Sequence, residues 1–515
     1  MVVAAQAASQ LVTLAVLAVL YRRLGVESFG LLGMVTPLLV LVRVFVSSGL
    51  DVATIQKADL SDRQVSALFW INQGLGLAMA ALIAAAAPLL GWFYGLATLL
   101  PLTLALAGTS IVHALGTQHQ ALLQRRLRLG RLALIRLGAL SAGGMAGIVA
   151  ALAGRGVWAL VIQQYVELGS LAALAWWAEP WRPGLAHRTP HAPREGVRHA
   201  ERDEYDDSRH AERDEYDGSR HAERDERAGG LVRFGGYYTL SSLMFYLVGN
   251  VDRILVGYTL GEKGLGLYSQ ARNLMMKPVG VVLTPLTGIM LPALSRAAHN
   301  HGLYVRLLLG FCRFIALTML PAAVGLAIVA PEAMRVLGGR QWAAAGPVLA
   351  ILALAILVQG FFDALGSVFA SAGRTDRLAY ASMVIAVVLS ASFALGLALG
   401  HGEAGRLQGV ALGYSASMLL LVFPCYLAFA LRTVGVAFRD WLAQLLPAAP
   451  AAGLMGLVVA LCHGLLGSVW RLSDPALLAV EVLAGVTVYL LLVRREIAWL
   501  LRQGLPNGTP PQNRY

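Results

Sequence analysis

The sequence predicts an all-α membrane protein that crosses the bilayer about fourteen times. Three observations lead to this class: 57% of the 515 residues are hydrophobic, only 14% are charged, and the mean hydropathy is +0.65. Soluble domains carry about 25% charged residues. The stretch from 64 to 124 contains no Asp, Glu, Lys or Arg at all. A soluble domain has no place for so long an uncharged stretch, because its surface needs charge.

Each expected span is a stretch of about 20 mostly apolar residues, the length that a helix needs to cross a hydrocarbon core about 30 Å thick. Several spans contain Pro or Gly, which transmembrane helices tolerate because neighbouring helices satisfy the freed backbone groups. In chain order the expected spans are 2–20, 31–50, 66–90, 97–117, 132–153, 157–178, 231–257, 275–296, 307–330, 345–370, 378–400, 406–430, 442–465 and 475–493.

The spans divide the chain into two pseudo-symmetric six-helix lobes and two extra C-terminal helices. Residues 1–181 form the N-terminal lobe, 231–432 the C-terminal lobe, and 433–515 the extra helices with a cytoplasmic tail. Between the lobes, residues 182–230 form a charged linker that carries an 11-residue repeat beginning RHAERDEYD. A period of 11 suits a straight helix, but every face of that helix is charged. We therefore expect a solvated linker, loose or helical, on the cytoplasmic side.

A fainter internal repeat supports the two lobes. LGVESFGL at 24–31 follows the first span, and LGEKGLGL at 260–267 follows the seventh. AGRGVWAL at 153–160 and AGRLQGVAL at 404–412 form a second pair. Both pairs relate one helix to the sixth helix after it. An even number of spans per repeat makes the two copies parallel, which is typical of transporters with a central cavity between lobes.

Arginine in short loops sets the orientation of membrane helices, because cytoplasmic loops carry the excess of Lys and Arg. The strongest cluster is the four arginines within 125–131. It places both termini in the cytoplasm, and assigns Arg253 to a loop on the outside. Arg22 and Arg23 favour the opposite orientation, and we give the larger cluster more weight.

The chain lacks the motifs of common enzymes. Its three lysines, Lys57, Lys263 and Lys277, do not lie in a phosphate-binding loop, and no GxSxG, HExxH or CxxC motif occurs. The three cysteines show no disulfide framework or zinc-site spacing. The net charge of +12 lies between apolar spans, where it orients helices, so no nucleic-acid partner is expected. We expect no catalytic residue, no metal site and no cofactor.

Charged groups inside spans indicate function, since a central Arg costs at least about 2.5–3.5 kcal/mol and normally faces a cavity. Arg43 lies in the second span, Arg272 and Lys277 begin the eighth, and Asp363 lies in the tenth. Asn72 is a polar candidate for the same cavity. These five residues are the expected substrate-binding set. Further charged residues fall in or next to spans, namely Glu167, Asp252 and Glu481.

Several longer strings resemble the bacterial polysaccharide exporters of the multidrug/oligosaccharidyl-lipid/polysaccharide exporter superfamily. In the first lobe these strings are LGVESFGLLGM, GLDVATIQKADLSDRQVSALFWIN, LLQRRLRLGRLALI and GRGVWALVIQQ. In the second lobe they are FGGYYTL, NVDRILVGYTLGEKGLGLYSQARNLMMKPV, LPALSR, GRQWAAAGPVLAIL and ASAGRTDRL. They cover most of residues 20–380 in family order. The charged repeat departs from the short inter-lobe loop of the family.

The resemblance implies that undecaprenyl-diphosphate-linked oligosaccharide is moved across the bacterial plasma membrane for O-antigen, capsule or exopolysaccharide synthesis. It implies membrane lipids, glycosyltransferases and a polysaccharide polymerase as partners. No ATPase motif is present, so an ion gradient or the membrane potential is the expected source of energy.

Three other functions stay open. A multidrug or cation antiporter should carry a carboxylate pair within one lobe, and Glu167 and Asp363 lie in different lobes. A lipid II flippase would move a lipid-linked diphosphate in the same way, but with another headgroup. A membrane polysaccharide polymerase or ligase, from a different class, would need a large outside loop with catalytic Arg or His, whereas the long loop here is repetitive and expected inside.

Overall fold

The structure, a computed structural model, describes residues 2–46, 61–184, 209–372, 374–469 and 473–503. Within these ranges the side chains of 42–46 and 209–239 are among those outside the described set. All regular elements of the described residues are helices. This confirms the all-α class predicted from the sequence.

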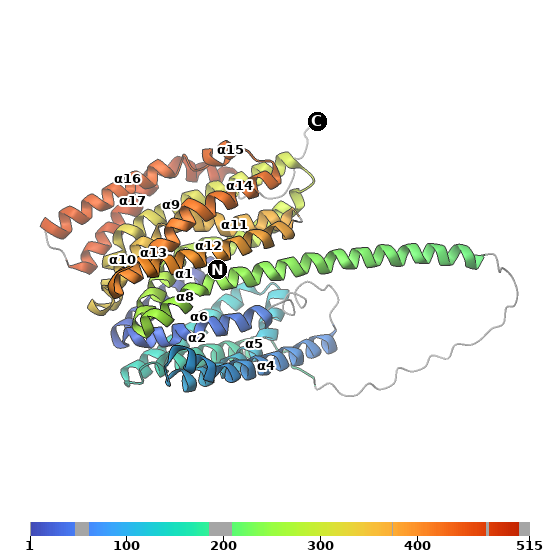
Figure 1. Ribbon diagram of the computed structural model, residues 1–515, viewed down its shortest axis with the longest axis horizontal. Coiled ribbons are helices and arrows are strands. Elements are labelled where there is room, and N and C mark those ends of the chain that lie inside the picture. The colour runs from blue at the N-terminus through green and yellow to red at the C-terminus, as the bar shows by residue number, and fades with distance from the viewer. Residues whose placement is uncertain (1, 47–60, 185–208, 373, 470–472, 504–515) are drawn as a thin grey trace.

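The first six helices pack together as one lobe, drawn in blue and teal in Figure 1. The ends of α4 show how the sequence limits a helix: Ser61 and Gln64 form a reciprocal capping box at its start, and Gly95 ends it in the left-handed conformation (φ 67°). The elements of this lobe are α1 (Val2–Arg23), α2 (Val26–Val46), α4 (Asp62–Tyr94), α5 (Leu99–Arg125), α6 (Leu129–Leu152) and α7 (Trp158–Ala178).

The second lobe is built around α8 and α9, and the C-terminal helices α16 and α17 pack on α9. Its elements are α8 (Arg209–Ala297), α9 (His301–Gly338), η1 (Arg340–Trp342), α10 (Ala345–Ala353), α11 (Ile356–Ser371), α12 (Thr375–Leu399), α13 (Gly402–Ser417), η2 (Met418–Val422) and α14 (Phe423–Val434). The C-terminal elements are α15 (Phe438–Ala443), α16 (Ala449–Cys462), η3 (His463–Val469) and α17 (Asp474–Gln503).

Among the described residues, nine helices are long and apolar enough to cross a membrane, and two sharply bent helix pairs raise this to eleven. The bent pairs are α1 with α2, at 119°, and α10 with α11, at 53°. Helix α8 is bent at Gly261 into two arms, residues 209–260 and 262–297. The expected fourteen spans are consistent with the described helices when α1 and α2 are counted separately, α8 is counted as its two arms, and α7, which is 21 residues long, is included. The long apolar helices make this a multi-pass membrane protein.

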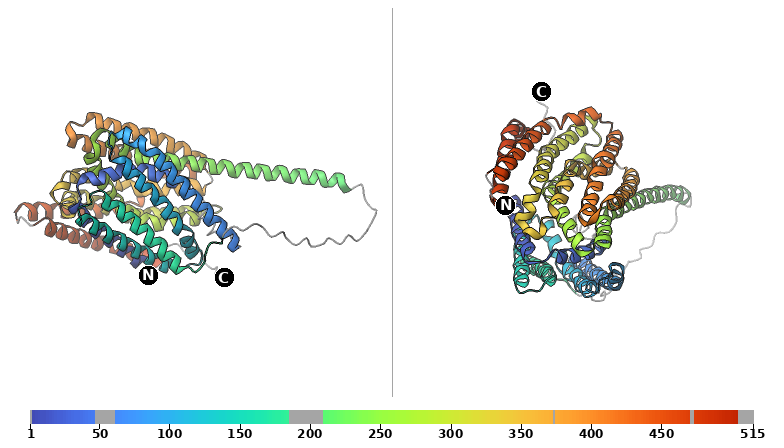
Figure 2. Two further views of the ribbon diagram at one scale, coloured as in Figure 1. Left: turned by 90° about the horizontal axis from the view of Figure 1, so that it is seen from below. Right: turned by 60° about the vertical axis from the view of Figure 1, so that its left-hand side comes forward.

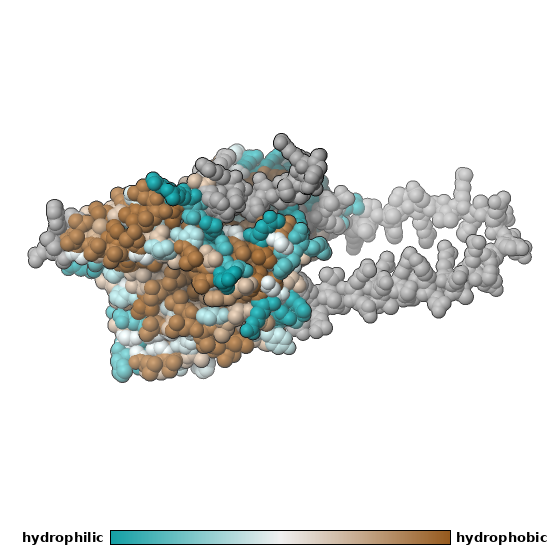
Figure 3. Space-filling view, turned by 90° about the horizontal axis from the view of Figure 1, so that it is seen from above, coloured by the Kyte–Doolittle hydropathy of each residue, from teal (hydrophilic) through white to brown (hydrophobic). Residues whose placement is uncertain are grey.

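Large apolar side chains on the outside of the helices agree with a lipid-facing surface. Trp92 and Leu420 are each 79% exposed, and Val387 is 70% exposed. Figure 3 shows one face of the molecule with a broad hydrophobic area and with hydrophilic residues toward both of its ends. Such an exterior would be an aggregation risk in water and is normal in hydrocarbon.

The later part of the charged repeat forms the beginning of helix α8. Helix α8 begins at Arg209, inside the segment predicted as the linker 182–230, and runs without a break past residue 231. Figures 1 and 2 show this part of α8 projecting alone beyond the bundle. The physical reason is that 11 residues are close to three helical turns, so the repeat extends the helix that follows it. Residues 185–208 of the linker lie outside the described residues.

The two lobes meet mainly where α2 packs on α8 and α1 on α9. The first internal repeat lies at this contact. A Cβ added at Gly30 would stand 1.7 Å from the Glu262 carbonyl oxygen, and one added at Gly266 would stand 2.2 Å from the Val26 carbonyl oxygen. Gly30 and Gly266 occupy the same position of the repeated motif, and so do Val26 and Glu262. The contact is therefore reciprocal, as expected for two lobes related by a pseudo-two-fold axis.

Aromatic and amide side chains fasten the same end of the lobes. The Tyr21 ring stacks on the Trp342 ring at 4.5 Å between centroids, and Phe29 meets Trp342 edge to face at 5.4 Å. The Trp342 indole N–H donates to the Tyr21 carbonyl at 2.9 Å, and Arg22 donates to the Val336 carbonyl at 2.7 Å. We call the glycine contacts together with this aromatic layer the clasp.

The second motif pair does not share local structure. Gly154 and Gly156 lie at positive φ in the turn between α6 and α7, whereas Gly405 and Gly409 lie inside α13. The likeness of these two strings comes from composition, since small residues are common in helices that pack closely in membranes.

Candidate substrate and coupling site

The centre of the second lobe contains an ion pair between the two arms of α8. Arg272, in the second arm, contacts Asp252, in the first, and the Tyr268 hydroxyl donates to the same carboxylate at 2.8 Å. The Asp252 side chain is fully buried and that of Arg272 is 11% exposed. A buried charge needs a partner of opposite sign. The bend of α8 at Gly261 supplies it, because it folds the second arm back against the first.

A cation–π contact and two hydrogen bonds connect this ion pair to α13 and α11. The Arg272 guanidinium lies over the Tyr414 ring, 5.0 Å from its centroid. The Tyr414 hydroxyl donates to Gln359 Oε1 at 2.8 Å, and Gln359 Nε2 donates to Asp363 Oδ1 at 2.8 Å. Asp363 is exposed, in contrast to the buried Asp252 at the other end. We call the chain Asp252–Arg272–Tyr414–Gln359–Asp363 the polar chain.

The polar chain brings two carboxylates into one lobe, which the sequence analysis did not foresee. That analysis compared Asp363 with Glu167, whereas the structure pairs Asp363 with Asp252 through three intervening side chains. The argument against a cation antiporter therefore loses its basis. The residues that sequence reasoning missed are Tyr268, Gln359 and Tyr414; Gln359 stands one helical turn before Asp363, and that spacing was the available signal.

Arg253 was wrongly assigned to an outside loop. It lies within α8, half-buried, and its Nη2 donates to Asn273 Oδ1 at 3.0 Å. Its neighbour Asn273 donates to Gln270, whose Oε1 also accepts from the Tyr21 hydroxyl of the other lobe at 2.7 Å. The expected span 231–257 already included Arg253, so the loop assignment disagreed with that span, and the helix runs through this position.

Comparison with known proteins shows the family to which this chain belongs. Residues 19–194 and 222–347, more than half of the chain, match the family described as polysaccharide biosynthesis protein. The chain belongs to the polysaccharide biosynthesis protein family. This confirms the resemblance drawn from the sequence strings.

Curated relatives of this family member include proteins of three bacteria. The teichuronic acid biosynthesis protein TuaB of Bacillus subtilis is 24% identical, over 90% of this chain and 89% of the relative. The lipopolysaccharide biosynthesis protein WzxC of Escherichia coli is 24% identical, over 83% and 79%. The succinoglycan biosynthesis transport protein ExoT of Rhizobium meliloti is 26% identical, over 65% and 61%.

Two solved structures share the fold of this polysaccharide biosynthesis protein. A lipid II flippase MurJ in an inward closed conformation superposes with a TM-score of 0.66 at 14% identity, over 97% of this chain and 99% of that one. An inward-facing multidrug resistance MATE transporter superposes with a TM-score of 0.60 at 14% identity, over 83% and 96%. At this identity the likeness concerns the fold alone.

The remaining predicted site residues of this family member occupy different surroundings. Lys277 lies half-buried further along the second arm of α8. Asn72 is 4% exposed and donates to Gln118 Oε1 at 3.4 Å, so it joins α4 to α5. Arg43 belongs to α2, and its side chain lies outside the described residues.

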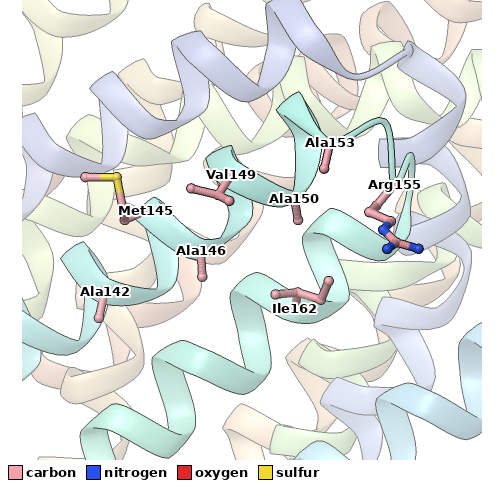
Figure 4. A pocket seen from close by; sticks show the side chains of 8 residues that line it. All are labelled: Ala142, Met145, Ala146, Val149, Ala150, Ala153, Arg155 and Ile162. Carbon is pink, nitrogen blue, oxygen red and sulfur yellow. The ribbon is translucent and has the colours of Figure 1, made fainter.

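A groove on the first lobe differs in character from the polar chain. Figure 4 shows it between α6 and α7, lined by apolar side chains, with Arg155 as the one charged residue among them. One lobe alone lines this groove, and it offers few polar groups for sugar hydroxyls. We therefore place the candidate site at the polar chain and the adjoining face of α2.

Tyr414 tests the polar chain at its middle. In Tyr414→Phe the ring under Arg272 remains and the donor to Gln359 is lost, so we expect a stability loss of about 1–3 kcal/mol. Tyr414→Leu also removes the cation–π contact and should cost about 2 kcal/mol more. Thermal unfolding of the purified protein measures both. Tyr380→Phe, at a side chain that is 64% exposed, is the control; equal losses in the two Tyr414 variants would contradict the cation–π contact.

Proposed function

We propose that this protein moves an undecaprenyl-diphosphate-linked oligosaccharide from the cytoplasmic to the outer leaflet of the bacterial plasma membrane, by alternating access between its lobes. The product would feed the synthesis of a surface polysaccharide. Glycosyltransferases would supply the substrate and a polymerase would consume it. Both termini would lie in the cytoplasm. The match of a polysaccharide biosynthesis family to parts of both lobes supports this substrate class.

The observation that carries the proposal is the packing of α2 against α8 at the lobe interface. Helix α2 of the first lobe contains Arg43, and helix α8 of the second lobe contains Arg272 and Lys277. A diphosphate needs cations, and arginine can hold phosphate oxygens in a bidentate manner. In the present conformation Arg272 is occupied by Asp252, so a bound diphosphate would share or displace that carboxylate.

The clasp supports alternating access. It joins the lobes at the end of the molecule opposite the projecting part of α8 (Figure 1). If that projecting part is cytoplasmic, the clasp is the outer gate in its closed state. Release of the substrate outside would then require the clasp to separate.

The membrane potential can drive such a step without ATP. Outward movement of an anion in an inside-negative cell gains about 2.3 kcal/mol per charge per 100 mV, so two charges gain roughly 4.6 kcal/mol. A gradient of a coupling ion could add to this through the carboxylates of the polar chain.

Disruption of the gene tests the proposal. A transporter performs no sugar chemistry, so surface polysaccharide should disappear while undecaprenyl-diphosphate-linked repeat units accumulate on the cytoplasmic leaflet. Mass spectrometry of extracted lipids, with an impermeant sugar-modifying reagent to report the leaflet, measures this. Accumulation on the outer leaflet would instead indicate a polymerase or ligase. Unchanged polymer with retention of cationic dyes would indicate the multidrug antiporter, and accumulation of lipid II would indicate the lipid II flippase.

A further inference from the structure

Three potential metal ligands meet where the C-terminal helices pack on the second lobe. Glu332 lies in α9, His463 begins η3 directly after α16, and Glu481 lies in α17. One ligand atom from each residue lies within 4.8 Å of the others. The polar chain contains none of these residues, so the cluster is separate from the candidate transport site.

The oxygens of the two glutamates are unusual for their burial. The Glu332 and Glu481 side chains are 3% and 0% exposed, yet Oε2 of each has no hydrogen-bond partner among the described residues. Leaving such a group unpaired costs free energy, and more so for a charged group. Two buried carboxylates of one small cluster therefore each keep an oxygen that a positively charged ligand can pair.

The distances suit a cation coordinated by nitrogen and oxygen. His463 Nδ1 lies 2.8 Å from Glu481 Oε1 and 3.9 Å from Glu332 Oε2. Metal–ligand bonds of about 2.0–2.2 Å in tetrahedral geometry place neighbouring ligand atoms roughly 3.3 Å apart. The two distances from His463 bracket this spacing, and all three ligand atoms lie within 4.8 Å of one another, so side-chain shifts of about an ångström would bring them to the spacing of a metal site.

The cluster and its neighbours carry an excess negative charge that a divalent cation would cancel. Arg335 donates to Glu332 Oε1 at 2.6 Å and lies 3.2 Å from Asp474. With three carboxylates and one guanidinium, these described residues carry a net charge of −2 when His463 is neutral. Arg335 also holds Glu332 in place, as outer partners commonly do for metal ligands. His463 is 43% exposed and offers the route of entry.

We propose that Glu332, His463 and Glu481 bind a divalent transition-metal cation, with zinc as the best fit to one imidazole and two carboxylates. Water would supply the remaining position. The metal would tie α16 and α17 to α9, and thus fix the C-terminal helix pair to the second lobe.

Metal binding by the full chain tests the proposal. The protein is purified through a tag without histidine, stripped with chelator, placed in lipid nanodiscs and dialysed against zinc, and bound metal is counted by mass spectrometry. We expect one saturable zinc per chain and a higher unfolding temperature with zinc. His463→Ala and Glu481→Gln should each weaken binding more than about tenfold, because losing even an outer partner costs that much. His463→Cys keeps a zinc ligand and should retain binding.

His401→Ala, at an exposed histidine elsewhere in the second lobe, is the matched control and should bind like the wild type. Binding that is equal in all variants would show adventitious zinc and overturn the proposal. So would the absence of saturable binding in the wild type. A third outcome would also overturn the proposal. If the wild type binds no metal, but its unfolding temperature in chelator rises at acid pH and this rise is lost in His463→Ala, then a protonated His463 pairs with the two carboxylates in place of a metal. None of these readouts depends on transport, so the proposed function is tested separately.

Discussion

Replacing Asp252 by Asn is expected to abolish export and to destabilise the protein by about 3–5 kcal/mol, because it leaves Arg272 as a buried, unpaired charge. Arg272→Ala should do the same by stranding the carboxylate, which is fully buried and accepts from Tyr268. Arg272→Lys should recover part of the stability and part of the export, since the charge survives and the planar guanidinium does not. Thermal unfolding and surface polysaccharide in the disrupted strain measure the two effects.

The double variant Asp252→Asn with Arg272→Gln separates structure from transport. It removes both charges, so stability should return to within about 1–2 kcal/mol of the wild type, since replacing both partners of a buried pair is often near neutral. Export should stay absent if Arg272 binds the diphosphate. Arg340→Ala, at an exposed cation of η1, is the control. Export restored in the double variant would give the ion pair a structural role alone.

Substituting either glycine of the clasp should block export while the protein remains in the membrane. A Cβ at Gly30 or Gly266 meets a backbone oxygen of the other lobe at 1.7 or 2.2 Å, and backbone cannot move aside as a flexible side chain can. The lobes must therefore part at this end. Because the contact is reciprocal, Gly30→Ala and Gly266→Ala should have similar effects, with export reduced at least about tenfold, which corresponds to 1.4 kcal/mol of conformational bias.

Gly33→Ala is the matched control, one turn further along α2, where the atoms nearest to the added Cβ are side-chain atoms of Leu265 and Ser269 at 3.3 Å. Gly74→Ala, with nothing within 4 Å, is a second control. A cysteine at Phe29, tested for labelling by an impermeant reagent, reports opening of the clasp; labelling should rise in both variants. Normal export in Gly30→Ala would show that the lobes do not need to close here.

Charged residues of the candidate site could be singled out from the sequence, whereas their uncharged partners could not. The sequence singled out Arg272 and Asp363 because a charge inside an apolar stretch is visible without knowing its neighbours. Their partners were not found, because Tyr414 and Gln359 come from other helices and carry no charge. Asn72 looked equally suitable for a cavity, yet it faces Gln118 on α5. The direction in which a polar side chain points depends on helix rotation, which hydropathy does not report.

By itself the sequence determined the membrane class, the positions of the helices and the motif shared by the two lobes. These are local properties: a helix in lipid satisfies its own backbone hydrogen bonds, so about 20 apolar residues suffice to define it. Tertiary structure alone decided that Gly30 meets Glu262, that Arg272 pairs with Asp252 across the bend of α8, and that Glu332, His463 and Glu481 converge. Residues so far apart in the chain meet only through the packing of whole helices, and that packing is set by many weak contacts at once.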